Sequence, residues 1–271
     1  MKIKLILLAL LISSTATAQN TESRSELISP TSHTAIVGSP GVLPPGVSFI
    51  ETFEGLAIGD LNGQNGWFAQ FGNWEVDNSN PFTGTQNMFS ISDGLGQTFA
   101  VSQTVTPGVT GIHAATAFVS MDNNAGVSWE FIPQAAVQGF VVTRIVFDGA
   151  GSIFALSNTN GGEYLDTGAS APSGYFRVAV VLEEAAGIFT LFINNDAVFS
   201  APAFGTVIDN IAFLSGMEVA NPTFFADDLA ISDNFMIETV PVPTFDVWGL
   251  LLLLASFIVL GAYYVRKTRV A

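Results

Sequence analysis

The sequence predicts an all-β protein with an antiparallel β-sandwich as its main body. Three observations predict this fold. Short apolar or alternating runs recur from residue 47 to residue 232, separated by Gly, Asn, Asp, Ser and Pro. No segment in this region shows a sustained helical period, and many short strands at this spacing are typical of a sandwich. Thirdly, about 200 residues are enough to bury one large core without a disulfide, and the chain has no cysteine.

The N-terminal segment, residues 1–18, has the three zones of a signal peptide. Lys2 and Lys4 provide a positive start, residues 5–12 are all apolar, and the segment ends in Ala-Thr-Ala, a small-x-small cleavage pattern. The apolar run is too short for a membrane anchor, which needs about 20 residues. We therefore expect export and cleavage after Ala18. Residues 19–46, rich in Ser, Thr, Pro and Gly, are expected to form a flexible leader.

The strands of the body are expected in residues 47–236. One strand, residues 175–183, alternates clearly between apolar and polar positions, and the run around residues 189–199 is interrupted by Asn-Asn-Asp. Because Asn and Asp tolerate left-handed turn conformations, that run predicts a hairpin. The expected strands are 47–54, 68–76, 87–92, 98–105, 113–121, 127–132, 140–148, 152–157, 175–183, 188–194, 197–200, 209–214 and 223–232.

The C-terminal segment, residues 247–271, is expected to hold one transmembrane helix. Residues 247–265 form a nearly continuous apolar run without a charge. As a helix it would be about 28 Å long, close to the thickness of a bilayer's hydrocarbon core. Arg266, Lys267 and Arg269 follow, and such basic residues stay on the cytoplasmic side. Residues 237–246 would form a short stalk, and the body would lie in the periplasm, anchored to the inner membrane, or be released to or displayed on the cell surface.

The charge of the body excludes some partners. Residues 19–246 hold three arginines and all 23 acidic residues, a net charge of −20. Such a surface repels nucleic acid and anionic lipid, so we expect neither as a partner of the body. It would attract cations, including calcium.

The tail resembles a bacterial C-terminal sorting domain, IPTL-CTERM. Pro243, Thr244, Trp248 and Gly249 match its motif at the usual spacing, ahead of a span and a basic end. Val242 departs conservatively from that motif, as does the residue after Thr244. The resemblance implies an envelope of the Gram-negative type and processing by an exosortase-like membrane enzyme. An ordinary single-span anchor is the alternative.

The body is similar, more distantly, to the concanavalin A-like lectin/glucanase jelly roll. The similarity lies in Phe-Glu-Gly at residues 53–55 with the Gly-Asp-Leu-Asn-Gly run that follows, in the hairpin at residues 189–199, and in the closing run at residues 224–231. It implies an antiparallel jelly-roll β-sandwich in which the first and last strands lie side by side, often with a structural calcium ion between them. The resemblance therefore implies Ca²⁺ ligands at Glu54, Asp227 and Asp228.

The expected calcium site also has an argument from the residues. Strand alternation would place Asp227 on one face with Phe225, Leu229 and Ile231. A carboxylate on an apolar face must be paired or metal-bound, because burying it alone is unfavourable. The alternative is that Asp227 lies at a strand end in contact with solvent.

Catalytic residues are not predicted. Glycosidases of the resembling fold carry Glu-x-Asp-x-x-Glu on one strand, and the nearest run, Glu75-Val76-Asp77, has Asn80 where the second Glu is needed. His113 has no cysteine or second histidine near it in the sequence, so a zinc site or a catalytic triad is unsupported. We expect a non-enzymatic protein.

A sugar-binding platform is a further possibility, because aromatic rings stack on sugars. Core positions are the more common role for such residues in a sandwich. The first interpretation is an exported, cell-surface-directed module, adhesive or matrix-associated. The alternative is a carbohydrate-binding, lectin-like protein with a glycan partner, and a divergent glycanase is a poorer third. The candidate platform residues are Trp67, Phe68, Phe71, Trp74 and Trp129.

Overall fold

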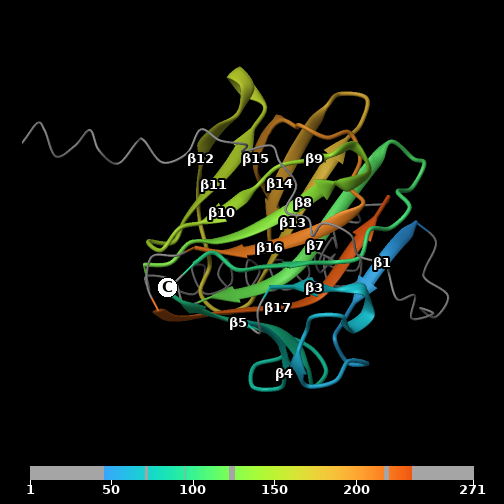
Figure 1. Ribbon diagram of the computed structural model, residues 1–271. Coiled ribbons are helices and arrows are strands. Elements are labelled where there is room, and N and C mark those ends of the chain that lie inside the picture. Colours follow the sequence, from blue (N-terminus) through green and yellow to red (C-terminus); the bar gives the residue numbers. More distant parts are fainter. Residues whose placement is uncertain (1–45, 71–72, 95, 122–125, 217–219, 234–271) are drawn as a thin grey trace, which may run out of the picture. The chain divides into compact units, whose positions relative to one another are not determined.

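The computed structural model describes residues 46–70, 73–94, 96–121, 126–216 and 220–233. This part of the chain consists of β-strands with a few single-turn 3-10 helices (Figure 1). The strands pair into two antiparallel sheets, which confirms the all-β prediction. The 3-10 turns are η1 (Gln64–Gly66), η2 (Ala136–Gln138) and η3 (Thr159–Gly161).

The first sheet, sheet A, contains both the first and the last strand. Its order is β15-β14-β13-β7-β17-β5-β4-β2, and β1 also pairs with β17. The long strand β17 therefore joins β1, β5 and β7. The strands are β1 (Val47–Glu51), β2 (Gly59–Asp60), β4 (Trp74–Asp77), β5 (Asn87–Asp93), β7 (Ile112–Met121), β13 (Phe176–Glu183), β14 (Ile188–Ile193), β15 (Asp196–Pro202) and β17 (Ala220–Ser232).

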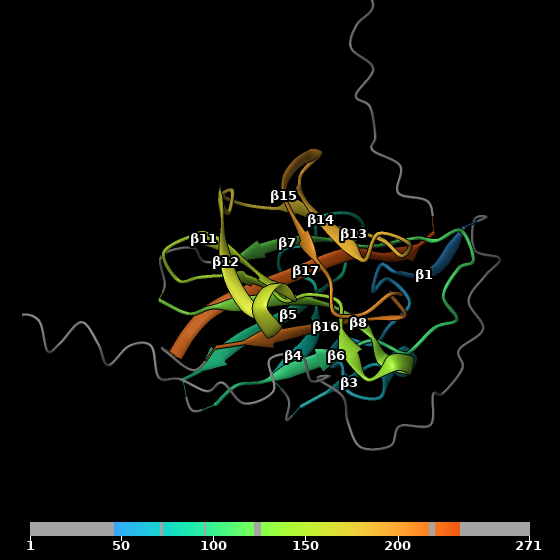
Figure 2. The same ribbon diagram turned by 90° about the horizontal axis from the view of Figure 1, so that it is seen from above.

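The second sheet, sheet B, has the order β12-β11-β10-β8-β16-β6-β3, with β9 also paired to β8. Figure 2 shows β8 and β16 in one layer and β7 and β17 in the other. The strands of sheet B are β3 (Phe68–Ala69), β6 (Phe99–Val101), β8 (Trp129–Ala135), β9 (Phe140–Val141), β10 (Ile145–Phe147), β11 (Ser152–Ser157), β12 (Glu163–Ser170) and β16 (Asn210–Ser215).

The main core lies between the inner faces of the two sheets and is rich in aromatic rings. Trp74 of sheet A packs against Trp129 of sheet B with ring centroids 6.2 Å apart, and Phe213 and Phe224 complete the group. All four side chains are buried. Fully burying one large apolar side chain contributes roughly 1.5–3 kcal/mol, so this cluster is a major part of what holds the sheets together.

The predicted strands are largely confirmed, and so is the hairpin. Strands β14 and β15 are joined at Asn194, whose φ of 55° is left-handed. Two strands were not predicted, namely β2 and β12. Strand β12 is an edge strand whose side chains alternate between exposed and half-buried positions. It buries no apolar face, so no periodic signal marks it.

The predicted signal peptide, leader, stalk and tail lie outside the described residues. Within the part of the chain that the structure describes, no helix is both long and apolar enough to cross a membrane.

Candidate functional site

The first predicted calcium ligand, Glu54, binds the loop between β4 and β5. Its Oε1 accepts hydrogen bonds from the backbone N–H groups of Thr85 and Gln86, at 2.7 and 2.8 Å, and its Oε2 accepts one from the Thr85 hydroxyl. These bonds, first that from the Thr85 N–H, lower the pKa of Glu54. Gly84 lies against the carboxylate with φ of 62°, and a Cβ there would be 2.2 Å from Oε1. The close contact therefore requires glycine.

The other two predicted ligands, Asp227 and Asp228, bind the same loop from the last strand. Asp227 Oδ2 accepts hydrogen bonds from the N–H groups of Phe82 and Thr83, at 2.9 and 3.1 Å. The Thr83 hydroxyl donates to Asp228. The structure thus gathers the three carboxylates around one loop, residues 82–86. They connect this loop to the chain after β1 and to β17.

The prediction that Asp227 shares one face of β17 with Leu229 and Ile231 is wrong. The pairing of β17 with β7 shifts between Asp227 and Ala230, and Asp228 has a left-handed φ of 46°. This β-bulge inserts one residue and reverses the alternation. Leu229 enters the core, whereas Asp227 lies on the outer face of sheet A, beneath the loop. Burial raises the pKa of Asp227 to about 6, because desolvation outweighs the N–H donors.

Oxygen atoms that could complete a calcium site lie next to these carboxylates. Asn87 Oδ1 and Gln86 Oε1 are buried and accept no hydrogen bond. Because Met88 pairs with Ala226, Asn87 lies beside Asp227. Carboxylate and amide oxygens are the ligands that calcium takes. Among the described residues no three Asp, Glu or His side chains come close enough to hold a metal by themselves, so amide or backbone oxygens would have to contribute.

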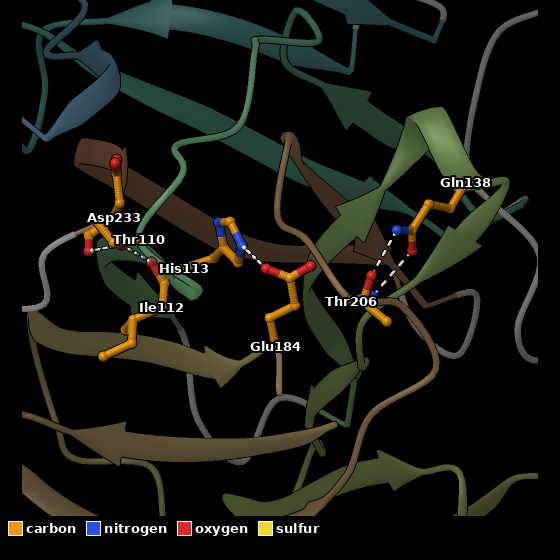
Figure 3. A network of polar contacts seen from close by, with 7 residues as sticks. All are labelled: Thr110, Ile112, His113, Gln138, Glu184, Thr206 and Asp233. Carbon is orange, nitrogen blue, oxygen red and sulfur yellow. Dashed lines mark hydrogen bonds and ion pairs between the residues drawn. The ribbon is translucent and has the colours of Figure 1, made fainter. Parts of the chain in front are cut away.

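The carboxylates weighed for catalysis are not paired with one another. Glu75 is exposed on β4, and Asp77 accepts hydrogen bonds from the N–H and the hydroxyl of Ser79. Figure 3 shows the Glu184 carboxylate turned toward the imidazole of His113, with Nε2 and the nearer oxygen 3.7 Å apart. In the part of the chain that the structure describes, no nucleophilic side chain forms a hydrogen bond with the His113 imidazole.

The candidate tryptophans are core residues. Trp67, Trp74 and Trp129 are at most 1% exposed. The indole of Trp67 donates to Glu51, and that of Trp74 donates to Thr98. Of the remaining candidates, Phe71 lies outside the described residues. Phe68 is half-buried, with its ring 5.6 Å from that of Phe99.

A second apolar cluster lies on the face of sheet B that is turned away from the core. Along β8, Trp129 and Phe131 enter the main core, so Glu130, Ile132 and Gln134 project to the other side. We call this side the outer face of sheet B. Its apolar cluster consists of Val101, Ile132, Val141, Leu156, Ala212 and Leu214, with Phe99, Tyr164 and Phe204 packed against it.

One end of this face carries an ion pair. Arg144 Nε donates to Glu130 Oε2 at 2.6 Å, and both side chains are largely buried. Burial disfavours the charged guanidinium, but the nearby Glu130 carboxylate together with Tyr164 outweighs this effect and raises the pKa of Arg144. The guanidinium therefore stays charged in this buried pair.

At the other end, Gln134 and Asn210 face each other across β8 and β16. Gln134 is fully buried and Asn210 is 3% exposed. Gln134 Oε1, Gln134 Nε2 and Asn210 Oδ1 have no hydrogen-bond partner in the protein. Buried polar groups are normally satisfied, and because both side chains lie inside the protein, a ligand in solvent does not reach these atoms.

Sequence reasoning did not find this face. Strand β8 is buried on both sides, so its apolar residues do not alternate in the usual way. The available signal is the spacing of Glu130 and Gln134, two polar residues on one side of an otherwise apolar strand. Only the register with β16 shows that Gln134 has Asn210 beside it.

Comparisons with known proteins establish the fold. No protein-family model matches the sequence, and no curated protein matches it. Among solved structures, the chain is similar to a sialidase, with a TM-score of 0.53 and 10% identity over 70% of this chain. The chain spans 19% of that sialidase. It is also similar to a structure from work on endo-acting O-glycanases of the human gut microbiota that initiate mucin breakdown. That comparison gives a TM-score of 0.50 and 10% sequence identity, and it covers 70% of this chain and 100% of the other chain.

Proposed function

We propose that this protein is a non-enzymatic carbohydrate-binding module that holds glycans on the outer face of sheet B. The observation that carries the proposal is the apolar cluster outside the core, which half-buried Phe99, Tyr164 and Phe204 border. Sugar-binding sites combine apolar surface for the C–H faces of the ring with a few fixed polar groups for its hydroxyls. Small-molecule sites in general have this composition.

The fold supports the proposal. The sialidase and the O-glycanases are named for action on glycans, and the chain shares their sandwich architecture. Half-buried Tyr164 and Phe99 border the apolar cluster, where aromatic rings offer large contact area and Tyr adds a polar group.

The carboxylates that β8 places on this face favour binding over hydrolysis. Glycosidases generally use two carboxyl groups flanking the bond that is cleaved, about 5–9.5 Å apart. On β8 the only outward carboxylate is Glu130, which is paired with Arg144. The other outward positions are Ile132 and Gln134, and neither can ionise.

The chain ends support a place for this activity outside the cytoplasm. The signal peptide would export the chain, and an exosortase-like enzyme would process the tail around Pro243 and Trp248. A glycan-binding body displayed at the cell surface would act in adhesion or in binding the extracellular matrix.

The test is a glycan array with the full-length protein in mild detergent. Tyr164→Ala removes a ring at the edge of the apolar cluster and is expected to weaken binding about tenfold, the effect of roughly 1.4 kcal/mol. Ile91→Ala, on an exposed position of sheet A, is the control and should bind like the parent. Absence of binding to any glycan, or equal loss in both variants, would reject the site. Release of reducing ends from a bound glycan would reject the non-enzymatic assignment.

A further inference from the structure

We propose that the outer face of sheet A is a docking surface for a partner protein that presents apolar side chains flanked by lysine or arginine. This face lies on the side of the sandwich opposite to the outer face of sheet B, so the proposal does not depend on glycan binding. It follows from the large apolar side chains that the central strands place outward and from the charges around them.

Three neighbouring strands, β5, β17 and β7, carry these side chains (Figure 1). Both sequence neighbours of each one are buried, so strand alternation turns the residue itself to the outer face. An antiparallel sheet with one face in water normally has polar residues at such positions. The four outward residues are Phe89, Ile91, Phe118 and Phe225.

The rings of this face lie next to one another. Phe89 and Phe225 are direct cross-strand partners, with ring centroids 5.2 Å apart. Phe118 is diagonal to Phe225 in the register of β7 with β17, a spacing within reach of aromatic side chains. The loop between β4 and β5 adds Phe82, which stacks on Phe118 with centroids 3.9 Å apart, and the ring of Tyr175 lies 5.4 Å from that of Phe82. We call these five rings and Ile91 the sheet A patch.

The patch is both accessible and fixed in place. Phe82 is 40% exposed and Ile91 38% exposed, and the other four side chains are half-buried. The Phe82 N–H donates to Asp227 at 2.9 Å, and the Tyr175 hydroxyl donates to the Asn80 carbonyl at 2.7 Å. A surface that is already ordered loses little conformational entropy when a partner binds.

Charged residues form the rim of the patch. Strand β4 places Glu75 opposite Phe89 and carries Asp77 two residues further on. Asp228 lies at the bulge of β17, and on the other side Arg177 of β13 is opposite Phe118. Carboxylates therefore predominate among the rim residues that the structure describes. An apolar centre within a polar rim is the usual anatomy of a protein interface.

The charge decides between possible occupants. Residues 19–246 carry a net charge of −20, which repels both an anionic lipid surface and a second copy of this chain. A basic partner is attracted instead, and its lysine or arginine side chains can also lie over the exposed face of the Phe82 ring. Charge complementarity therefore favours a partner with apolar and basic side chains together.

The experiment measures the binding of three labelled peptides to the full-length protein in mild detergent by fluorescence anisotropy, with detergent alone as the blank. The first peptide alternates phenylalanine with lysine. In the second the lysines are replaced by glutamate, and in the third the phenylalanines are replaced by serine. The first peptide is expected to bind at least tenfold more tightly than either of the others.

Two variants locate the binding site, and each has a matched control. Ile91→Ser removes an exposed apolar side chain from the patch and should weaken binding of the first peptide about fivefold. Val137→Ser, at a residue 68% exposed beside sheet B, should leave it unchanged. Glu75→Lys should weaken binding about threefold, the size of an exposed ion pair. Glu163→Lys on β12 changes the net charge equally and should have a smaller effect.

Melting temperatures of all four variants should stay close to that of the parent, because each side chain is exposed. If one patch variant does not fold, the other still tests the site.

Three outcomes would overturn the proposal. Equal binding of the three peptides would do so, as would equal losses in a patch variant and its control. The third is self-association of the parent that Ile91→Ser abolishes, since the occupant would then be a second copy. Glycan binding should be the same in Ile91→Ser as in the parent, and its loss there would assign the patch to sugars instead.

Discussion

The Asp227 carboxylate gives the sharpest prediction for stability. Burial raises its pKa to about 6, from an ordinary value of 3.8. It is fully buried, and its hydrogen bonds come from Phe82 and Thr83, far away in the sequence. The folded protein therefore holds the proton more tightly than the unfolded chain does. This contribution to stability is complete below the unfolded pKa and is lost as the pH rises through the folded pKa.

The magnitude follows from the size of the shift. One pKa unit corresponds to about 1.36 kcal/mol, so the whole contribution is about 3 kcal/mol. About 2 kcal/mol of it should disappear between about pH 4.5 and about pH 7.5. Asp227→Asn cannot titrate in this range. The unfolding free energy of the parent relative to this variant should therefore fall by about 2 kcal/mol across that interval.

The assay is urea unfolding of the full-length protein in mild detergent, with a chelator present so that calcium does not hold the carboxylate. Asp77→Asn is the matched control. Although partial burial raises the pKa of Asp77, the hydrogen bonds from Ser79 outweigh it and the net shift is downward. Its contribution is fully present above the ordinary value of 3.8 and is lost only as the pH falls below it, so the difference from the parent should stay nearly constant between about pH 4.5 and about pH 7.5. A constant difference between parent and Asp227→Asn across the interval would refute the reasoning.

Three further predictions concern calcium, packing and topology. If calcium binds at Glu54, Asp227 and Asp228, millimolar calcium should raise the melting temperature of the full-length protein relative to chelator. Glu54→Gln should abolish this difference, and identical melting points would exclude the site. Gly149→Ala places a Cβ 2.5 Å from the backbone of Gly126, so it should destabilise the fold by more than about 2 kcal/mol. Gly55→Ala, with open space around it and no left-handed φ, should lose less in the same unfolding measurement. Protease added to intact spheroplasts should remove the body and spare the C-terminus, and digestion of the C-terminus would contradict the predicted orientation.

The ion pair on sheet B can be tested by a double-mutant cycle. Arg144→Met removes the cation that pairs with the buried Glu130 carboxylate and should destabilise the protein by about 3–5 kcal/mol. Adding Glu130→Gln removes the isolated charge and should recover a large part of that loss. A double variant that is no more stable than the single one would show that the two side chains act independently.

Much of the fold could be predicted from local pattern. Residues 176–182 alternate between core and outer positions, and β13 forms there because the period of a strand is two. Asn194 marks the β14–β15 turn because asparagine tolerates the left-handed conformation. The lack of a helical period was equally informative, since the described residues form two sheets.

The candidate sites could be predicted only in part. The carboxylates Glu54, Asp227 and Asp228 all bind the loop of residues 82–86, and their role as calcium ligands stays a prediction. Their arrangement was not predicted. The bulge at Asp228 depends on how β17 pairs with β7 and on the loop around Thr83, which lies about 145 residues earlier.

By itself, the sequence determined the class of fold, the positions of most strands and the acidity of the body, because each depends on local composition or on a short period. The tertiary structure alone decided which polar residues meet. Gln134 and Asn210 are far apart in the chain, and neither has an unusual sequence context. They become neighbours because antiparallel register sets them side by side on the face of sheet B that the core does not use, and register is a property of the paired strands rather than of either strand alone.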